Sequence, residues 1–296
     1  MDPVTHTLAG VALGNALFRR RAGPAAVPIL ALASNLPDLD AVVHLTGDPA
    51  AVLLRRTFGH ALWLLPLWSA GLAWLLWRRY RHLKYGTVFG MVLLGFAVHI
   101  LFDLINSFGV VLFWPFSPAR PELAMVFIID FILTGLLALP LLLLIARPLR
   151  GHLERMSRLA LVCVGLYLAC CGVSRARAAG ILEAAAAGAT PPDFAYVFPE
   201  PLGPHRWRGV VRRGTRYDVY LIRSFSGTAT LEETVITQTD DLRVAAARDT
   251  PFGRRLGIFF KAPVWSREGE VTTVYDLRFQ SLVLKRPPVF KFRVPA

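Results

Sequence analysis

The sequence predicts a mainly α-helical protein that crosses a membrane several times and carries a small antiparallel β domain at its C-terminal end. Of its 296 residues 54% are hydrophobic, and the mean hydropathy of +0.48 is high for a soluble chain. Residues 1–174 contain 14 Lys and Arg and 8 Asp and Glu, whereas the shorter remainder contains 19 and 12. The front part therefore has the composition of membrane helices, and the back part that of a soluble domain.

Six hydrophobic segments are predicted to form the helical part. Four of them are long enough, or nearly so, to cross a hydrocarbon core of about 30 Å, which takes roughly 20 helical residues. The first two are shorter and are expected to form a helical pair that dips into the membrane, or short spans packed against the others. In chain order the segments are Val4–Phe18, Ala25–Leu36, Ala61–Trp77, Gly86–Ile105, Leu123–Ala146 and Leu159–Val173.

The remaining residues are predicted to form a linker and a β-rich domain. We expect the transmembrane helical domain with its metal site over 1–174, a linker over 175–191 and an extracytoplasmic β domain over 192–296. Short stretches with alternating polar and apolar residues, separated by Gly and Pro turn signals, predict the strands. These stretches are Tyr217–Ile222, Thr228–Thr237, Leu256–Phe260, Val271–Phe279 and Val289–Val294.

Arg and Lys clusters predict the orientation of the helices, because cytoplasmic loops are enriched in both residues. The strongest clusters lie at residues 19–21, 78–84 and 147–158. Six alternating segments with these clusters inside place the N-terminus and the β domain outside the cytoplasm.

Several protein classes are disfavoured. The formal charge of +13 is divided almost equally between the two parts and no nucleic-acid-binding motif accompanies it, so we predict no nucleic-acid partner. The three cysteines lie in one apolar run and match neither a metal-ligand spacing nor a disulfide framework. The N-terminus lacks a basic region ahead of an apolar core, so no cleaved signal peptide is expected.

Ionisable residues collect at one predicted side of the membrane. Each costs about 2.5–3.5 kcal/mol at the centre of a membrane helix, so their presence indicates a function. His99 and Asp103 are four residues apart and share one helical face. Imidazole and carboxylate groups are ligands for Zn²⁺, Mn²⁺ or Fe. We therefore predict a divalent-metal site, with zinc as the first choice and Mn or Fe as alternatives, formed by His6, Asp38, Asp40, His60, His99 and Asp103.

Each of these residues also has a structural interpretation. His99 and Asp103 can form a buried hydrogen-bonded pair, Asp38 and Asp40 can belong to a turn, and the other two histidines can cap helices. Two carboxylates two residues apart repel each other unless a cation or a proton lies between them, which favours the metal. Asp130, eight residues into its apolar run, is expected to be a ligand, a partner of a ligating histidine or a general base.

Four sequence blocks resemble the YdjM-type family, described as LexA-binding, inner-membrane-associated, metal-dependent hydrolases. The blocks are MDPVTHTLAGVALG, NLPDLD, RRTFGHALW and HILFDLINSFGVVLFWPF, and the resemblance covers about residues 1–146. It implies the same six metal ligands. Arg55 stands where members usually carry a histidine, and Ala61 replaces a serine. Pro204 to Arg208 resembles an element of longer members.

The predicted function is membrane-bound, metal-dependent hydrolysis of a phosphoester or ester in a lipid or other amphiphile, in a bacterial inner (cytoplasmic) membrane. A metal-bound hydroxide would attack, Asp130 or Asp38 would manage the proton, and Arg55 or Arg56 would hold an anionic headgroup. The expected partners are membrane lipids and an amphiphilic substrate, and the sequence identifies no protein partner. The alternative is a non-catalytic metal- or proton-binding scaffold or regulator. A transporter is disfavoured because no inverted repeat is visible.

Overall fold

The computed structural model describes residues 1–142, 151–188 and 190–295. The chain forms two compact units, which are described separately. The helical unit comprises Met1–Leu45, Leu54–Leu123 and Ile128–Ala169. The β unit comprises Thr46–Leu53, Ala124–Phe127 and Cys170–Ala296.

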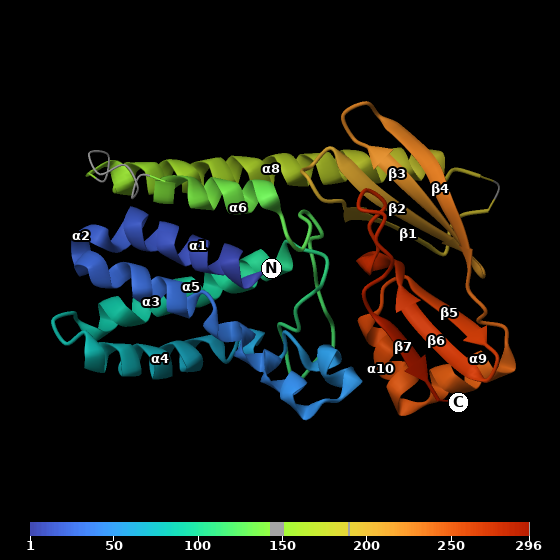
Figure 1. The fold of residues 1–296 in the computed structure, drawn as a ribbon, viewed down its shortest axis with the longest axis horizontal. Helices are drawn as coiled ribbons and strands as arrows, with labels where there is room; N and C mark the ends of the chain where they lie inside the picture. Colours follow the sequence, from blue (N-terminus) through green and yellow to red (C-terminus); the bar gives the residue numbers. More distant parts are fainter. Residues whose placement is uncertain (143–150, 189, 296) are drawn as a thin grey trace. The chain divides into compact units, whose positions relative to one another are not determined.

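The first predicted pair of segments forms a helical hairpin (Figure 1). Helix α1 (Pro3–Leu13) continues through η1 (Gly14–Phe18) and α2 (Arg19–Ala22), and the chain returns through η2 (Gly23–Ala25) and α3 (Ala26–Ala33). Helices α1 and α3 approach closely because Gly10 lacks a side chain, since a Cβ there would lie 2.5 Å from the carbonyl oxygen of Leu30. At 11 residues α1 spans only about 16 Å, too little to cross a bilayer alone.

The next two helices match their predicted segments. Three 3₁₀ segments, η3 (Leu36–Thr46), η4 (Pro49–Leu54) and η5 (Phe58–His60), lead into α4 (Leu65–Arg79), and α5 (Tyr85–Leu104) follows. The core of the unit lies where α3, α4 and α5 meet, and Ile29, Leu30 and Met91 are fully buried there. This apolar packing fixes α5, which supplies two of the predicted ligands.

The predicted span Leu123–Ala146 does not form one long helix. Its described part contains α6 (Phe131–Ala138) and η6 (Leu139–Leu141), and residues 143–146 lie outside the described residues. Helix α6 begins late because the Asp130 side chain accepts a hydrogen bond from the backbone N–H of Leu133, at 2.9 Å, and so caps its first turn. Asp130 therefore lies before the helix, not two turns into it.

The last helix of this part is longer than predicted. Helix α8 (Leu153–Ala185) contains the predicted segment Leu159–Val173 and continues without a break through most of the expected linker. Cys163, Cys170 and Cys171 all lie on it as free thiols. The linker sequence is helical because its alanines, with Leu182 and Glu183, have high helix propensity.

Fewer helices than predicted are long enough to cross a membrane. In the described part of the chain three helical runs pass by length and composition, namely Pro3–Thr46, Tyr85–Leu104 and Leu153–Ala185. A fourth is added if Ala50–His60 and Leu65–Arg79, bent by 76°, form one span. Six spans are thus not supported, because α1, α3 and α6 are too short individually.

The β unit contains two antiparallel sheets. The first has the order β1-β2-β3-β4, with β1 (Phe194–Pro199), β2 (Arg206–Arg213), β3 (Arg216–Arg223) and β4 (Thr228–Ile236). The second has the order β5-β6-β7, with β5 (Pro263–Glu268), β6 (Val271–Asp276) and β7 (Lys291–Val294). The C-terminal β-rich region is therefore confirmed as an antiparallel one.

One predicted strand is wrong. Leu256–Phe260 lies mostly in α10 (Pro251–Phe259), which follows α9 (Leu242–Asp249). Thr250 caps α10 by accepting from the N–H of Gly253 at 3.0 Å, and Leu256 and Phe259 are buried three residues apart on one helical face. The alternating pattern in a five-residue window concealed this helical period.

Candidate metal centre

The six predicted ligands all lie in the helical unit, where hydrogen bonds, close ion-pair contacts and ring stacking join them into one cluster. Five are fully buried, and only the side chain of Asp38 is partly exposed, at 16%. Four separate elements supply them: His6 on α1, Asp38 and Asp40 on η3, His60 at the end of η5, and His99 and Asp103 in the last turns of α5.

The hydrogen bonds of the two Nδ1 atoms set the tautomers of the His99 and His60 rings. Nδ1 of His99 lies 2.7 Å from the carbonyl oxygen of Ser34, which can only accept, so this nitrogen donates. Nδ1 of His60 lies 3.0 Å from Oδ2 of Asp40, which accepts from it in the same way. In the neutral rings Nε2 of both histidines therefore presents a lone pair, and these two nitrogens face each other at 3.1 Å. Two lone pairs at that distance repel unless a cation or proton lies between or beside them.

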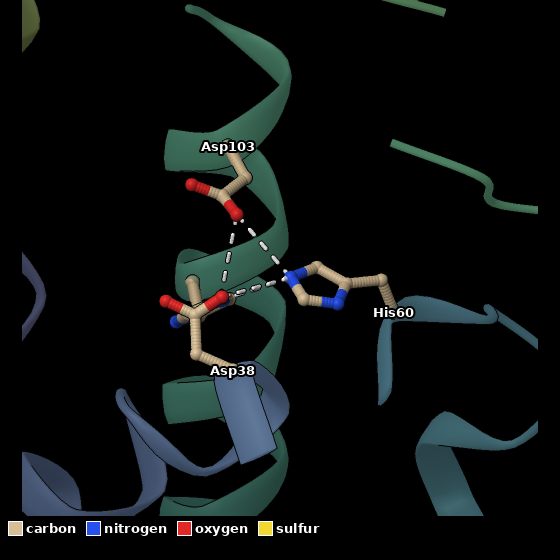
Figure 2. Close-up of side chains that lie close together, drawn as sticks. Asp38, His60 and Asp103 are labelled. Atoms are coloured by element: carbon tan, nitrogen blue, oxygen red, sulfur yellow. Dashed lines mark hydrogen bonds and ion pairs between the residues drawn. The ribbon is translucent and has the colours of Figure 1, made fainter. Parts of the chain in front are cut away.

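Two carboxylates complete the group, and Figure 2 shows Asp38 and Asp103 turned toward the ring of His60. Oδ2 of Asp103 lies 3.2 Å from Nε2 of His60 and 3.6 Å from Nε2 of His99. Oδ1 of Asp38 lies 3.8 Å from both nitrogens and has no hydrogen-bond partner although it is buried. One ligand atom from each of the four residues lies within 4.8 Å of the others.

The donor set fits a divalent cation. Two neutral imidazoles and two carboxylates are ordinary ligands of Zn²⁺ and related metals. The unpartnered oxygen of Asp38 would otherwise bear a desolvation cost of about 1–3 kcal/mol. Asp38, His60, His99 and Asp103 can therefore hold a metal ion.

Asp40 and His6 lie around this group of four. Besides the His60 ring, Oδ2 of Asp40 accepts from the backbone N–H of Thr57 at 2.9 Å. A carboxylate behind a ligating histidine orients the ring and raises its basicity. The His6 ring stacks on that of His99, with centroids 3.8 Å apart, and its Nε2 lies 3.3 Å from Oδ1 of Asp103.

The two neighbouring arginines, both predicted to bind substrate, are in different settings. Arg56 is buried, with Nε 2.7 Å and Nη2 2.9 Å from the oxygens of Asp103. Its Nη1 donates to Oδ1 of Asn106 at 3.1 Å, and its guanidinium lies over the ring of Phe108. The Arg55 side chain is 33% exposed, with Nη2 3.7 Å from Oδ1 of Asp38. Arg55 thus has donors left for another anion, whereas those of Arg56 are occupied by the protein.

Asp130 lies outside the group of four. Its Oδ1 accepts from Leu133 and its Oδ2 accepts from the hydroxyl of Tyr167 at 2.7 Å. Both oxygens are therefore engaged in joining the start of α6 to α8.

Sequence reasoning missed several partners. The carbonyl of Ser34, the backbone of Thr57 and the amide of Asn106 all orient site residues. The first two are main-chain groups, for which side-chain identity gives no signal. The ammonium group of Met1, which also contacts Oδ1 of Asp103, gives none either.

A small apolar cavity lies beside the cluster. Its volume is about 100 Å³, and Asp40 is the one ionisable residue in its lining. Gly59 forms part of the wall, and a Cβ at this position would lie 2.1 Å from the carbonyl oxygen of Pro37. The other lining residues are Leu36, Pro37, Leu39, Phe58, Trp68 and Phe96.

Long apolar helices and a buried His and Asp cluster define the class: a helical membrane protein with a candidate site for a divalent metal. The family model of the YdjM inner membrane protein matches residues 1–178, so the chain belongs to this family of inner membrane proteins, as its motifs indicated. It is also 32% identical over 124 residues to YfhP of Bacillus subtilis (strain 168), described as uncharacterized. That match covers 40% of this chain and only 38% of the relative. No solved structure matches the chain.

Proposed function

We propose that this protein is a membrane-bound hydrolase that uses a divalent metal, zinc in the first instance, to cleave a phosphoester or ester of an amphiphile. The observation that supports it best is the convergence of two imidazole lone pairs with the unpartnered oxygen of Asp38. When bound, a divalent cation supplies Lewis acidity and lowers the pKa of a coordinated water.

The residues around the site have separate proposed roles in proton transfer, anion binding and positioning. Asp38 is the proposed proton acceptor, because it alone among the four has a partly exposed side chain. Arg55, next to it, would hold an anionic group of the substrate. Arg56 positions Asp103 by its paired hydrogen bonds. Asp130 is the second candidate for proton transfer, although its present partners are a helix end and Tyr167.

An amphiphilic substrate is supported by the apolar surroundings of the site. The cavity beside Asp40 can take a few methylene groups, and apolar side chains nearby in sequence are exposed. Leu39 is 62% exposed and Trp63 53% exposed, and the indole N–H of Trp63 donates to the carbonyl of Trp114. Exposed tryptophans of this kind are common where lipid headgroups meet the hydrocarbon core.

The decisive test compares Asp38→Asn with Asp48→Asn in the full chain in detergent. Asp48 is an exposed aspartate ten positions further along and contacts none of the cluster. We expect wild type and Asp48→Asn to carry a divalent metal by elemental analysis and to hydrolyse a p-nitrophenyl ester or phosphodiester. Asp38→Asn should retain its fold and lose about 100-fold or more in turnover, the usual effect of removing a positioned acid or base. Equal turnover in the two variants would refute the assignment.

A second candidate is a scaffold or regulator without catalysis. It is favoured by one observation: Arg56 already pairs with both oxygens of Asp103 without any metal. Metal bound stoichiometrically without turnover of any tested ester would support this role. Absence of metal from wild type, after reconstitution with Zn²⁺, Mn²⁺ or Fe²⁺, would leave only the hydrogen-bonded scaffold.

The orientation of the chain is also proposed rather than given by the fold. The Arg-rich clusters place the C-terminal end outside the cytoplasm. Alkaline phosphatase fused after the last residue should be active, and a green fluorescent protein fusion at the same position should be dark. The reverse pattern would put the metal centre on the cytoplasmic face.

A further inference from the structure

The β unit contains a second polar cavity, remote in sequence from every residue of the metal centre. Its volume is about 500 Å³, within the usual range of about 300–1,000 Å³ for small-molecule sites. It opens where the β2–β3 turn, the segment after β4 and the start of β5 meet. The residues that matter for its chemistry are Arg212, Tyr217, Thr237, Thr239, Arg248 and Trp265.

The floor of this cavity is held by hydrogen bonds between the two sheets. The hydroxyl of Thr237 accepts from the backbone N–H of Trp265 at 2.9 Å, and the N–H of Thr237 donates to the carbonyl of Thr215 at 2.8 Å. Tyr217 is buried and its hydroxyl donates to the carbonyl of Pro263 at 3.2 Å. The cavity is therefore lined partly by buried residues of the unit, Tyr217, Thr237 and Trp265, and partly by residues of the adjoining turns.

The electrostatics of the cavity favour an anion. Burial raises the pKa of the Tyr217 phenol, while hydrogen bonding and charge from Arg212 and the charge of Arg248 lower it, so both guanidinium groups act on this hydroxyl. Within the described residues neither arginine forms an ion pair with a carboxylate, and Nε of Arg212 is buried without a partner. One carboxylate, Asp240, is in the lining and is exposed. The lining is thus cationic and rich in donors.

The remaining lining groups suit a hydroxylated ligand. The indole ring of Trp265 is 3% exposed and no hydrogen bond of its N–H to another described residue is present. Thr239 adds a hydroxyl at the rim. Two arginines that line one cavity can bind a phosphate through paired charge-assisted hydrogen bonds. The volume then leaves room for a group about the size of one sugar ring.

We propose that this cavity binds a phosphate monoester carried on a small polyol, of the size of a hexose phosphate, with Arg212 and Arg248 holding the phosphate. The same chemistry occurs in free sugar phosphates and in phosphorylated lipid headgroups. The site does not depend on the metal centre, so it stands or falls separately from the proposed hydrolase.

The test is calorimetric titration of the full chain in detergent with glucose 6-phosphate, inorganic phosphate and glucose as probes. We expect glucose 6-phosphate to bind most tightly, phosphate more weakly, and glucose least. Arg248→Gln should weaken glucose 6-phosphate binding by about tenfold or more, the usual scale for a lost charged hydrogen bond. Arg212→Gln should do the same.

Arg243→Gln is the matched control, because Arg243 lies on the same helix α9 but pairs with Glu270 away from the cavity. Its affinity for glucose 6-phosphate should equal that of wild type. Unchanged affinity in Arg248→Gln and Arg212→Gln, both with wild-type melting temperature, would overturn the proposal. So would the failure of glucose 6-phosphate to bind wild type.

A further experiment distinguishes a soluble phosphate ester from a phosphorylated lipid headgroup as the ligand. The chain is placed in phosphatidylcholine nanodiscs with and without phosphatidic acid, and titrated again with glucose 6-phosphate. Weaker apparent binding in the presence of phosphatidic acid would assign the site to a lipid headgroup. Identical binding in the two nanodiscs would assign it to a soluble phosphate ester.

Discussion

The two units each bury a group of charged side chains, but they satisfy them differently. In the β unit, Arg208 pairs with Glu200 at 2.6 Å and donates to the carbonyl of Arg278 at 2.9 Å. Glu200 in turn accepts from the hydroxyl of Ser281 at 2.6 Å and from the backbone N–H of Val283 at 3.1 Å. Both carboxylate oxygens thus have donors.

The helical unit shows the opposite arrangement. Buried oxygens of Asp38 and Asp40 lack hydrogen-bond partners, and two imidazole nitrogens face each other with their lone pairs. A buried carboxylate with donors on all sides stabilises a fold, whereas one whose acceptors converge on a common point is arranged for a cation. This difference, and not burial alone, separates a structural network from a candidate site.

The largest effect should come from breaking the network around Glu200 and Arg208, in which both carboxylate oxygens have donors. Glu200→Gln removes the carboxylate that pairs directly with the buried Arg208, which costs about 3–5 kcal/mol of folding free energy. We expect the β unit to melt at a clearly lower temperature by differential scanning fluorimetry, with metal content per folded molecule unchanged. Glu268→Gln, at an exposed pair with Lys291, is the control and should change stability by less than about 1 kcal/mol. Equal melting temperatures for the two variants would show that the network is not structural.

A change in the candidate metal centre should alter metal affinity more than folding stability. Asp40→Asn keeps an acceptor for Nδ1 of His60 but removes the charge behind the ring. Loss of such a partner costs about 10–100-fold in metal affinity, so the Kd from competition with a chromophoric chelator should rise by that factor. His44→Ala, an exposed histidine on the same η3 segment, should have no effect. An unchanged Kd in Asp40→Asn would mean that His60 is not a ligand.

The smallest effect is expected at Asp130. Like Glu200, and unlike Asp38, it has a hydrogen-bond donor for each carboxylate oxygen. Asparagine is also a good helix cap, so Asp130→Asn should lose about 1 kcal/mol or less through a weaker bond from Tyr167. Metal content should stay at the wild-type value. A variant that keeps its metal but loses turnover would instead give Asp130 the proton-transfer role, and unchanged turnover would leave that role to Asp38.

The sequence predicted the chemistry of the site better than the helices that carry it. Ionisable groups in apolar segments are costly, and for this reason His99 and Asp103 were recognisable without a structure. Their contacts to the carbonyl of Ser34 and to Arg56 were not, because they depend on how distant segments pack. In the same way the run from Leu123 is apolar throughout, but one capping carboxylate at Asp130 decides where its helix begins.

The close contact between Gly59 and Pro37 has a consequence for binding entropy. The Cα of Gly59 abuts the backbone that leads into Asp38, and Gly59 is followed directly by His60. The separation of these two ligands is thus set by main chain against main chain, with no flexible side chain between them. Such a preorganised pair loses little conformational freedom when an ion arrives, so more of the interaction energy remains as affinity.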